Sequence, residues 1–211
     1  MIKQTLVALA ASFFVHTATA DALNPDLASG VEGWEQAIND SDLAVYIKSI
    51  PGKDTKAFKA FTYIQAPKEK IFERVKDLPS YCDWFADCGG ARFLKVINDK
   101  ESIGYFINKT PWPVDDRDAT FHRTLSTTAS GGLKLRLVAE TGHLEEQACC
   151  VRLNDADGYI LVEDHIAGES SKVTYEFYSD PGGDIPAWLI NSMITQSPET
   201  TLRNLKALFE K

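Results

Sequence analysis

The residues of this sequence whose types most readily do chemistry are its histidines. Beyond the first twenty residues these are His122, His143 and His165. None belongs to an HExxH zinc motif, and the chain has no GxSxG nucleophile elbow, no phosphate-binding loop and no GxGxxG fingerprint. No histidine has an evident nucleophile beside it in the sequence. The sequence therefore predicts a protein that is not an enzyme and carries no cofactor.

A second candidate is a cluster of carboxylates. Asp115, Asp116 and Asp118 follow directly after Trp112 and Pro113. Carboxylate oxygens are the ligands of hard cations such as Ca²⁺. A solvated loop that leads into a strand has the same composition, and we favour that interpretation, so no metal site is expected.

Arg117 lies inside this acidic stretch and is the most informative polar residue. In a strand it shares a face with Ala119 and Phe121, and with Arg123 further along. A charge on an apolar face must be paired or must reach water. Arg117 could therefore extend to the surface from the strand start, or lie buried and orient the polar headgroup of a ligand, or pair with an acid inside a cavity.

Four cysteines complete the reactive side chains: Cys82, Cys88, Cys149 and Cys150. They form no CxxC motif, which argues against zinc-ribbon and thioredoxin-like sites. Cys82 and Cys88 are close enough in sequence to bridge across a helix end, and buried thiols are the alternative. Cys149 and Cys150 are adjacent and would point to opposite faces of a strand, so we expect them to be two free thiols.

Length and charge limit the class of protein. The chain has 211 residues, 25% of them charged, and a formal net charge of −8. Binding of nucleic acid needs clustered lysine and arginine, which an acidic chain without basic runs does not offer. We therefore expect one globular domain that has no nucleic-acid partner.

The first twenty residues have the pattern of a signal peptide. Lys3 supplies a positive start, residues 5–15 are apolar, and Ala18-Thr19-Ala20 forms a small-residue cleavage site. The apolar run is shorter than the roughly 20 residues of a membrane-spanning helix. The prediction is export with cleavage after Ala20, which leaves residues 21–211 as the mature domain. In a bacterium its location would be the periplasm, an oxidising compartment that permits disulfides.

The elements that must position these residues follow from hydrophobic periodicity. Alternation is clean in residues 132–140, where Leu133, Leu135 and Leu137 share one face. Strands are expected near residues 43–50, 56–64, 91–97, 102–108, 117–126, 132–140, 148–154, 158–166 and 172–179. Residues 30–40, around Trp34, are interpreted as a short amphipathic helix. One-sided strands of this kind are typical of an antiparallel sheet with one face in water.

Helical spacing marks three further segments. Pro67 begins a helix and Pro79 a second short one. The last segment, residues 185–211, is predicted to be one long helix that Pro198 kinks. Because it is the only long helix available to cover the apolar face of the sheet, the fold class is α+β: a curved antiparallel sheet of nine strands wrapped around a C-terminal helix.

Several motifs resemble the START domains, the steroidogenic-acute-regulatory-related lipid-transfer family. The clearest is Asp180-Pro-Gly-Gly-Asp-Ile-Pro-Ala-Trp-Leu-Ile-Asn191, which is similar to the family's approach to the C-terminal helix. Weaker matches are Lys56-Ala-Phe-Lys-Ala60, Ala66-Pro67, Tyr81 with Trp84 and Cys88, Arg117-Asp118, Val151-Arg152 and Gly158-Tyr159. The resemblance extends from about Trp34 to the end of the chain and suggests a bacterial, exported member.

The resemblance implies a helix-grip fold with an internal apolar cavity for one lipid or sterol under the C-terminal helix. Some members of the family place a buried acid in the strand before the Arg-Asp strand, paired to that arginine. The corresponding residues 102–108 contain no acid, although the hydroxyl of Tyr105 is available instead.

The function expected from this resemblance is non-enzymatic binding and transfer of a lipid, sterol or similar apolar molecule by a monomer, with transient membrane contact. Two alternatives are an enzyme of the wider cyclase/dehydratase superfamily and an envelope interaction protein with a vestigial cavity, because a fold alone does not choose among functions. The expected ligand-binding residues are Arg117, Tyr105, Phe121, Trp188, Met193 and Ile194.

Overall fold

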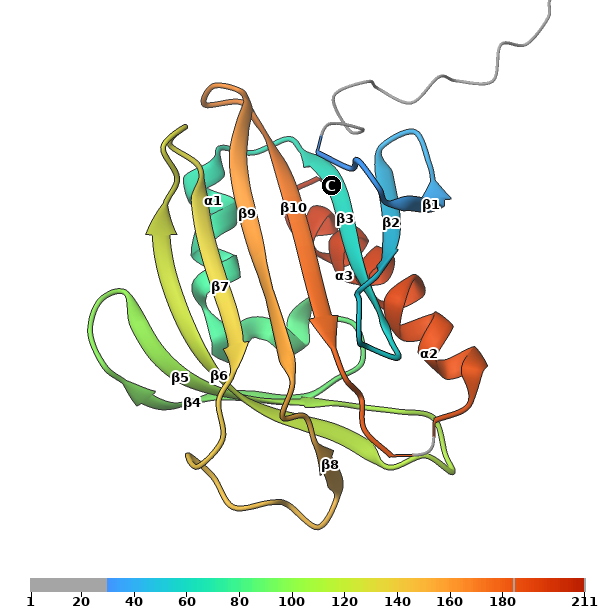
Figure 1. Cartoon of the computed structure of the whole chain (residues 1–211). Coiled ribbons are helices and arrows are strands. Elements are labelled where there is room, and N and C mark those ends of the chain that lie inside the picture. The colour runs from blue at the N-terminus through green and yellow to red at the C-terminus, as the bar shows by residue number, and fades with distance from the viewer. Residues whose placement is uncertain (1–29, 184, 211) are drawn as a thin grey trace, which may run out of the picture.

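The computed structural model describes residues 30–183 and 185–210 of the chain. The expected signal peptide, residues 1–20, lies outside this part. Figure 1 shows the arrangement of the elements. In chain order they are β1 (Glu35–Asn39), β2 (Leu43–Ser49), β3 (Lys56–Ile64), α1 (Lys68–Lys76), the 3₁₀ helix η2 (Leu78–Asp83), β4 (Cys88–Val96), β5 (Glu101–Asn108), β6 (Asp116–Thr127), β7 (Leu133–Ala139), β8 (Cys150–Arg152), β9 (Ala156–Ile166), β10 (Ser170–Ser179), α2 (Ala187–Ile194) and α3 (Gln196–Ala207).

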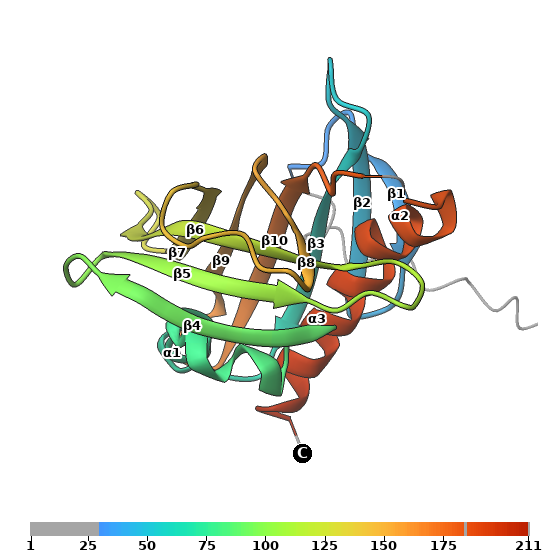
Figure 2. The same cartoon turned by 90° about the horizontal axis from the view of Figure 1, so that it is seen from below.

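One strongly curved sheet forms the body of the molecule. Its strands follow the order β1-β2-β3-β10-β9-β7-β6-β5-β4, and each neighbouring pair is antiparallel. The short strand β8 pairs with β6 in the parallel sense. Figures 1 and 2 show β4, β5 and β6 turned across the other strands, so that the sheet curls around α3. The α+β class and the curved antiparallel sheet expected from the sequence are confirmed.

The expected helix at residues 30–40 is wrong. Residues Glu35–Asn39 form the edge strand β1, which pairs with β2 and contains a bulge between Gln36 and Ile38. The apolar residues of this segment are too few to hold a helix against the core, whereas the free edge of β2 offers a row of backbone hydrogen bonds. The strand raises the sheet from nine expected strands to ten among the described residues.

The C-terminal segment is two helices, where one kinked helix was expected. Helix α2 ends at Ile194, Thr195 has a non-helical backbone (φ −124°, ψ −62°), and α3 begins at the next residue. The break precedes Pro198 because a proline ring clashes with the carbonyl four residues earlier, here that of Ile194. Pro198 itself sits in the first turn of α3, where its missing N–H costs nothing. Within the described residues, neither helix is of a length and apolarity that would cross a bilayer.

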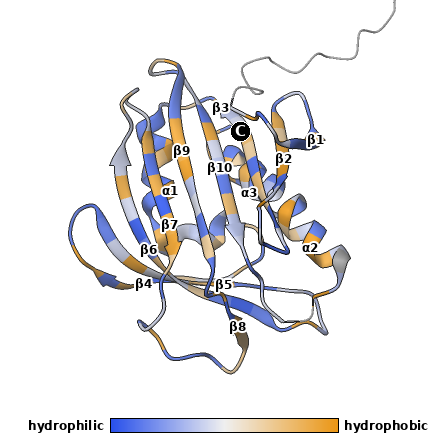
Figure 3. Ribbon diagram, in the orientation of Figure 1, coloured by the Kyte–Doolittle hydropathy of each residue, from blue (hydrophilic) through white to orange (hydrophobic). Residues whose placement is uncertain are grey.

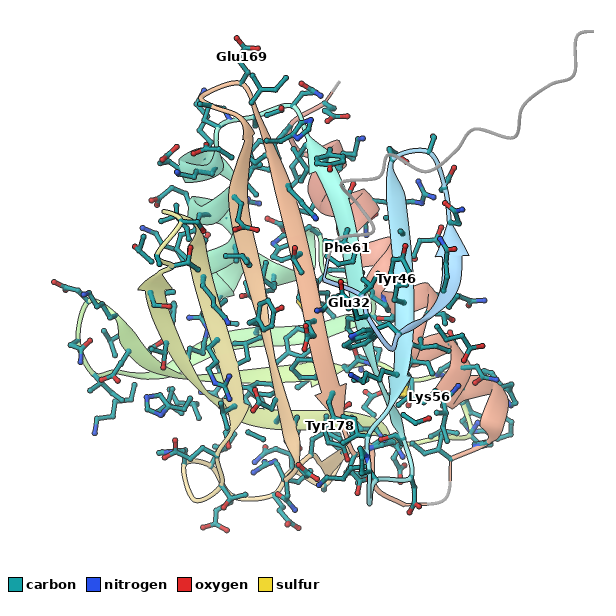
Figure 4. The ribbon with its side chains drawn as sticks, turned by 45° about the horizontal axis from the view of Figure 1, so that its top comes forward. Glu32, Tyr46, Lys56, Phe61, Glu169 and Tyr178 are labelled. Atoms are coloured by element: carbon teal, nitrogen blue, oxygen red, sulfur yellow. A yellow bond between two sulfur atoms is a disulfide. The ribbon has the colours of Figure 1, made fainter. Side chains whose placement is uncertain are left out.

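The two faces of the sheet carry different side chains. The concave face packs on α1 and α3 and contains the main core, with Leu135, Ile160 and Val173 from neighbouring strands fully buried beside Leu205 of α3. Alternating bands of hydropathy along the strands are visible in Figure 3. On the convex face, Tyr46 and Phe61 form a small separate cluster, and Figure 4 shows them on β2 and β3, on the side away from α3.

Candidate functional site

A pocket lies between the concave face of the sheet and helices α2 and α3. Figure 2 shows these helices crossing the opening between the β2–β3 side and the β4–β5 side of the curled sheet. The cavity volume is about 110 Å³, whereas a well-packed core leaves few voids larger than one water. The space is therefore a feature of the fold.

Eight aromatic rings line this pocket. They come from β3, η2 and its following turn, β5, β6 and β10, and the rings are Phe58, Tyr81, Phe85, Tyr105, Phe106, Phe121, Tyr175 and Phe177. Many touch one another, as with Phe85, whose ring centroid lies 5.2 Å from Phe106 and 5.7 Å from Tyr175. Such a wall is rigid and apolar, and it presents few polar groups to a ligand.

Helix α2 supplies the lid of the pocket through one of its faces. Ile190, Met193 and Ile194 line the space, as their i, i+3, i+4 spacing predicts for one side of a helix. Trp188, which we expected to face the ligand, is 57% exposed and does not line the pocket. Five positions separate it from Met193, which places it well around the helix from the lining face.

Arg117 is buried, with 2% of its surface exposed. Its Nε donates to the carbonyl of Pro181 at 3.1 Å, its Nη2 to that of Gly182 at 3.1 Å, and its Nη1 to the carbonyl of Asp115 at 2.5 Å. Burial lowers the pKa of this guanidinium. Of the three roles considered for Arg117, extension to the surface is wrong. Arg117 lines the pocket, but it mainly holds the segment that leads into α2 against the start of β6.

Asp118 forms a buried ion pair that the sequence did not predict. Arg152 donates through Nε to Oδ1 of Asp118 at 2.8 Å and through Nη2 to Oδ2 at 2.9 Å. The hydroxyl of Tyr105 donates to the same Oδ2 at 2.8 Å. Burial and this carboxylate raise the pKa of Tyr105 to about 12, and the hydrogen bonds to Asp118 raise the pKa of Arg152. The hydroxyl of Tyr105 thus donates its hydrogen bond to Asp118, and it is not a partner of Arg117.

The clustered aspartates do not converge. Asp116 accepts from Lys109 Nζ at 2.8 Å, while Asp118 points to Arg152 and Asp115 offers its backbone carbonyl to Arg117. Across residues 30–183 and 185–210, no group of histidine, cysteine, aspartate and glutamate side chains is arranged to hold a metal. None of the three histidines discussed above lines the pocket.

Arg123 is a second buried arginine of the pocket wall, with 3% of its surface exposed. It lies six residues beyond Arg117 on the same face of β6, at the end of the pocket away from α2. The sequence placed Arg123 on this face without assigning it a role. The same alternation that predicts a buried Phe121 also predicts that Arg123 is buried.

All four cysteines form disulfides. Cys82 and Cys88 join η2 to the start of β4, with 4.9 Å between their Cα atoms. Cys149 and Cys150 pair with each other, and the described residues hold no free cysteine. The expectation of two free thiols is wrong because Cys149 lies in a turn and only Cys150 begins β8, so the alternation of a strand does not separate the two side chains.

Two tryptophans stand exposed at the α2 end of the molecule. Trp112, in the loop between β5 and β6, is 91% exposed, and Trp188 of α2 is the other. Figures 1 and 2 both show this loop at the same end of the molecule as α2. Helix α2 has no charged residue and is coloured mostly as hydrophobic in Figure 3.

A curved sheet that grips a C-terminal helix over an aromatic pocket defines the helix-grip class of proteins. The family model of the START domain matches residues 15–210. The chain therefore belongs to the START domain family, as its motifs indicated.

Individual relatives agree with this assignment. An uncharacterised protein of Pseudomonas aeruginosa is 31% identical over 180 residues, which cover 85% of this chain and 88% of that one. The phosphatidylcholine transfer protein of Bos taurus is 23% identical over 183 residues, 82% of each chain. Among solved structures, a STAR-related lipid transfer protein of Xanthomonas axonopodis has 27% identity and a TM-score of 0.76, and the match covers 85% of this chain and 99% of that one.

Proposed function

We propose that this protein binds one lipid, sterol or similar apolar molecule in the pocket under α2 and transfers it between membranes. The observation that carries the proposal is the aromatic pocket closed on one side by a short helix. Burial of a long hydrocarbon chain against these rings contributes about 0.8 kcal/mol for each CH₂ group removed from water. A few polar groups on the wall are enough to orient the molecule. The lipid-transfer names of the relatives point the same way.

The route into the pocket runs past α2. This helix is bounded by the non-helical Thr195 on one side and by Gly182 and Gly183 on the other, both with positive φ of 60° and 64°. Left-handed backbone is accessible to glycine without strain, so this segment is suited to a hinge. Small displacement of α2 and of the β5–β6 loop would open the pocket at the end where Trp112 and Trp188 are exposed.

We further propose that this end makes the transient membrane contact. Indole rings concentrate at the interface between headgroups and hydrocarbon, where their apolar body is buried and the N–H stays wet. An uncharged helix with an exposed tryptophan, beside a loop with another, presents such a surface directly at the pocket opening.

Binding without catalysis is part of the proposal. A cyclase- or dehydratase-like enzyme needs a group facing the ligand that can give or take a proton near neutral pH. Asp118 is the one carboxylate of the pocket lining among the described residues, and it is occupied by Arg152 and Tyr105. Burial raises the pKa of the lining phenols of Tyr81 and Tyr175, which makes them weaker acids.

We also propose that the protein is exported, to the periplasm in a bacterium, and acts there as a monomer. The N-terminal pattern and the four cysteines support export. Intact mass should show a chain that begins at Asp21, and light scattering during gel filtration should give the mass of one chain. A chain that retains Lys3 would contradict cleavage after Ala20.

The experiment that tests the function uses the mature protein from a secreting host. Native mass spectrometry, followed by extraction, identifies any co-purified lipid, and a fluorescence assay follows lipid exchange between donor and acceptor vesicles. One bound lipid per chain and faster exchange are expected. Failure to bind any of a broad panel of lipids would instead favour an interaction protein with a vestigial cavity.

A further inference from the structure

Arg123 is buried in the pocket wall with few partners for its charge. Its Nη2 donates to the carbonyl of Lys76 at 2.8 Å, and two longer contacts reach the Ser102 hydroxyl at 3.4 Å and the Tyr81 hydroxyl at 3.5 Å. Its Nε is buried without any hydrogen-bond partner. A guanidinium carries five N–H donors, so at least one of them is unused in a place that water does not reach freely.

Aromatic rings supply the rest of its surroundings. The guanidinium carbon lies 5.0 Å from the ring centroid of Phe93 and 5.8 Å from that of Tyr81. These contacts offset part of the desolvation of the cation, but they are weaker than an ion pair. In the part of the chain that the structure describes, no carboxylate lies within ion-pair distance of Arg123.

The neighbouring strand leaves no room for an internal acid. Gly104 of β5 lies beside Arg123, and a Cβ built on this glycine would meet the Cδ of Arg123 at 2.8 Å and the Leu78 side chain at 2.6 Å. Any acid at this position would have to displace both neighbours. The absence of a side chain on Gly104 thus lets Arg123 and Leu78 fill this space, and this position of β5 supplies no acid to compensate the charge of Arg123.

The charges of the pocket lining point to an anionic occupant. Lys56, Arg117 and Arg123 line the space with one acid, Asp118. Asp118 is neutralised by Arg152, and the half-exposed Lys56 pairs with Glu35, so the buried cations of the lining are Arg117 and Arg123. The chain as a whole carries a formal charge of −8. A pocket with an excess of cations inside an acidic protein requires a specific explanation, because an unpaired buried charge is costly.

We propose that the pocket selects amphiphiles whose headgroup is an anionic oxygen acid, a carboxylate or a phosphate monoester, and that Arg123 binds this headgroup. The inference rests on the function proposed above. Arg123 is preferred to Arg117 as the main anchor because each of the three nitrogens of Arg117 already donates to a backbone carbonyl, whereas Nε of Arg123 is buried without a partner. Six residues of extended strand separate the two arginines, so the headgroup would lie about 20 Å from the α2 end, with the hydrocarbon chain leading back to it.

Three single-chain probes with the same hydrocarbon isolate the headgroup: oleate, oleyl phosphate and oleyl alcohol. Each is titrated into the wild-type protein below its micellar concentration, and binding is followed by calorimetry. We expect at least one of the two anions to bind about tenfold or more tightly than the alcohol, because a charge-assisted hydrogen bond is stronger than a neutral one. The two anions differ only in headgroup, so the tighter one identifies which acid the site prefers.

Arg123→Met removes the charge and keeps the length of the side chain. It should abolish the preference for the anions while the alcohol still binds. The matched control is Arg136→Met, which removes the same charge from an exposed site on the outer surface of β7 and should leave the preference intact. Circular dichroism establishes that each variant is folded.

A measurement on the wild type covers the case in which Arg123→Met does not fold. Oleate labelled with ¹³C at its carboxyl group is titrated by NMR in the complex, and a nearby guanidinium should keep the bound carboxylate ionised at a pH below its usual pKa. Equal affinity for all three probes, a preference that survives Arg123→Met, or an unshifted bound carboxylate would overturn the proposal for Arg123 while leaving lipid binding intact. Failure of all three probes to bind would overturn the proposed function as well.

Discussion

Arg152 holds both carboxylate oxygens of Asp118 across the parallel pairing of β8 with β6, and both side chains are almost fully buried. In the part of the chain that the structure describes, the three-residue strand β8 joins the sheet through its pairing with β6, so the ion pair and the backbone ladder reinforce each other. Tyr105 adds a third hydrogen bond from β5. Three strands, β5, β6 and β8, therefore meet at one carboxylate on the wall of the pocket.

Removal of that carboxylate should destabilise the protein strongly. Asp118→Ala leaves the Arg152 guanidinium buried without its partner, and breaking such a pair typically costs about 3–5 kcal/mol of the free energy of unfolding. Urea denaturation measures the change. The control is Asp157→Ala, which breaks the half-exposed pair with Arg136 and should cost less than about 1 kcal/mol. An equal loss of unfolding free energy in the two variants would mean that the buried pair stabilises the protein no more than the half-exposed pair does.

The thiol content distinguishes the cysteine pairing of the structure from the pairing expected from the sequence. All four cysteines are paired in the structure, so the oxidised protein unfolded in guanidinium chloride should show no free thiol, and after reduction it should show four. Thiol counting with a chromogenic disulfide reagent measures this. Two thiols before reduction would indicate that Cys149 and Cys150 are not joined.

Strands with one buried face were readily predicted from the sequence. Leu133, Leu135 and Leu137 alternate with polar residues because β7 has one face on the core and one in water. The edge strand β1 was missed because its exposed residues carry no such alternation, and its structure depends on the free edge of β2. The hydrophobic pattern of residues 35–39 alone does not show that a free strand edge is available to pair with them.

The candidate site was only partly predictable for a related reason. Phe121 follows from the alternation along its strand and lines the pocket, as do Met193 and Ile194, which were expected there together with Trp188. The partner of Asp118 is Arg152, 34 residues away, and only the parallel pairing of β8 brings them together. Likewise, the exposure of Trp188 depends on which side of α2 packs against the sheet, and an almost uniformly apolar helix sequence does not specify that side.

The exposed tryptophans should control the rate of transfer more than the affinity. The double change Trp112→Ala and Trp188→Ala removes the apolar surface proposed to contact membranes, and it alters neither the core nor the pocket wall. Exchange of lipid between vesicles should slow roughly tenfold, while binding at equilibrium stays the same.

The matched control for that experiment replaces two exposed apolar residues at the opposite end. Val96, the last residue of β4, and Ile97, in the turn that leads to β5, are 68% and 44% exposed. Figures 1 and 2 place this turn far from α2. Val96→Ala with Ile97→Ala should leave the exchange rate unchanged. A similar slowing in both double variants would show that general surface hydrophobicity, and not the α2 end, governs membrane contact.

A charge placed on the inner face of α2 should block the pocket. Met193 lines the space, and Met193→Arg would fill it with a long side chain whose guanidinium must either stay buried or push the helix outward. Uptake of a fluorescent lipid should fall about tenfold or more, with circular dichroism unchanged if the position faces a true cavity. Asn191→Arg adds the same charge to the exposed side of the same helix and should bind lipid as the wild type does. Normal uptake by a folded Met193→Arg protein would show that lipid does not occupy the space under α2. Loss of uptake in Asn191→Arg would show that a charge anywhere on this helix disturbs binding, and not only a charge on its inner face.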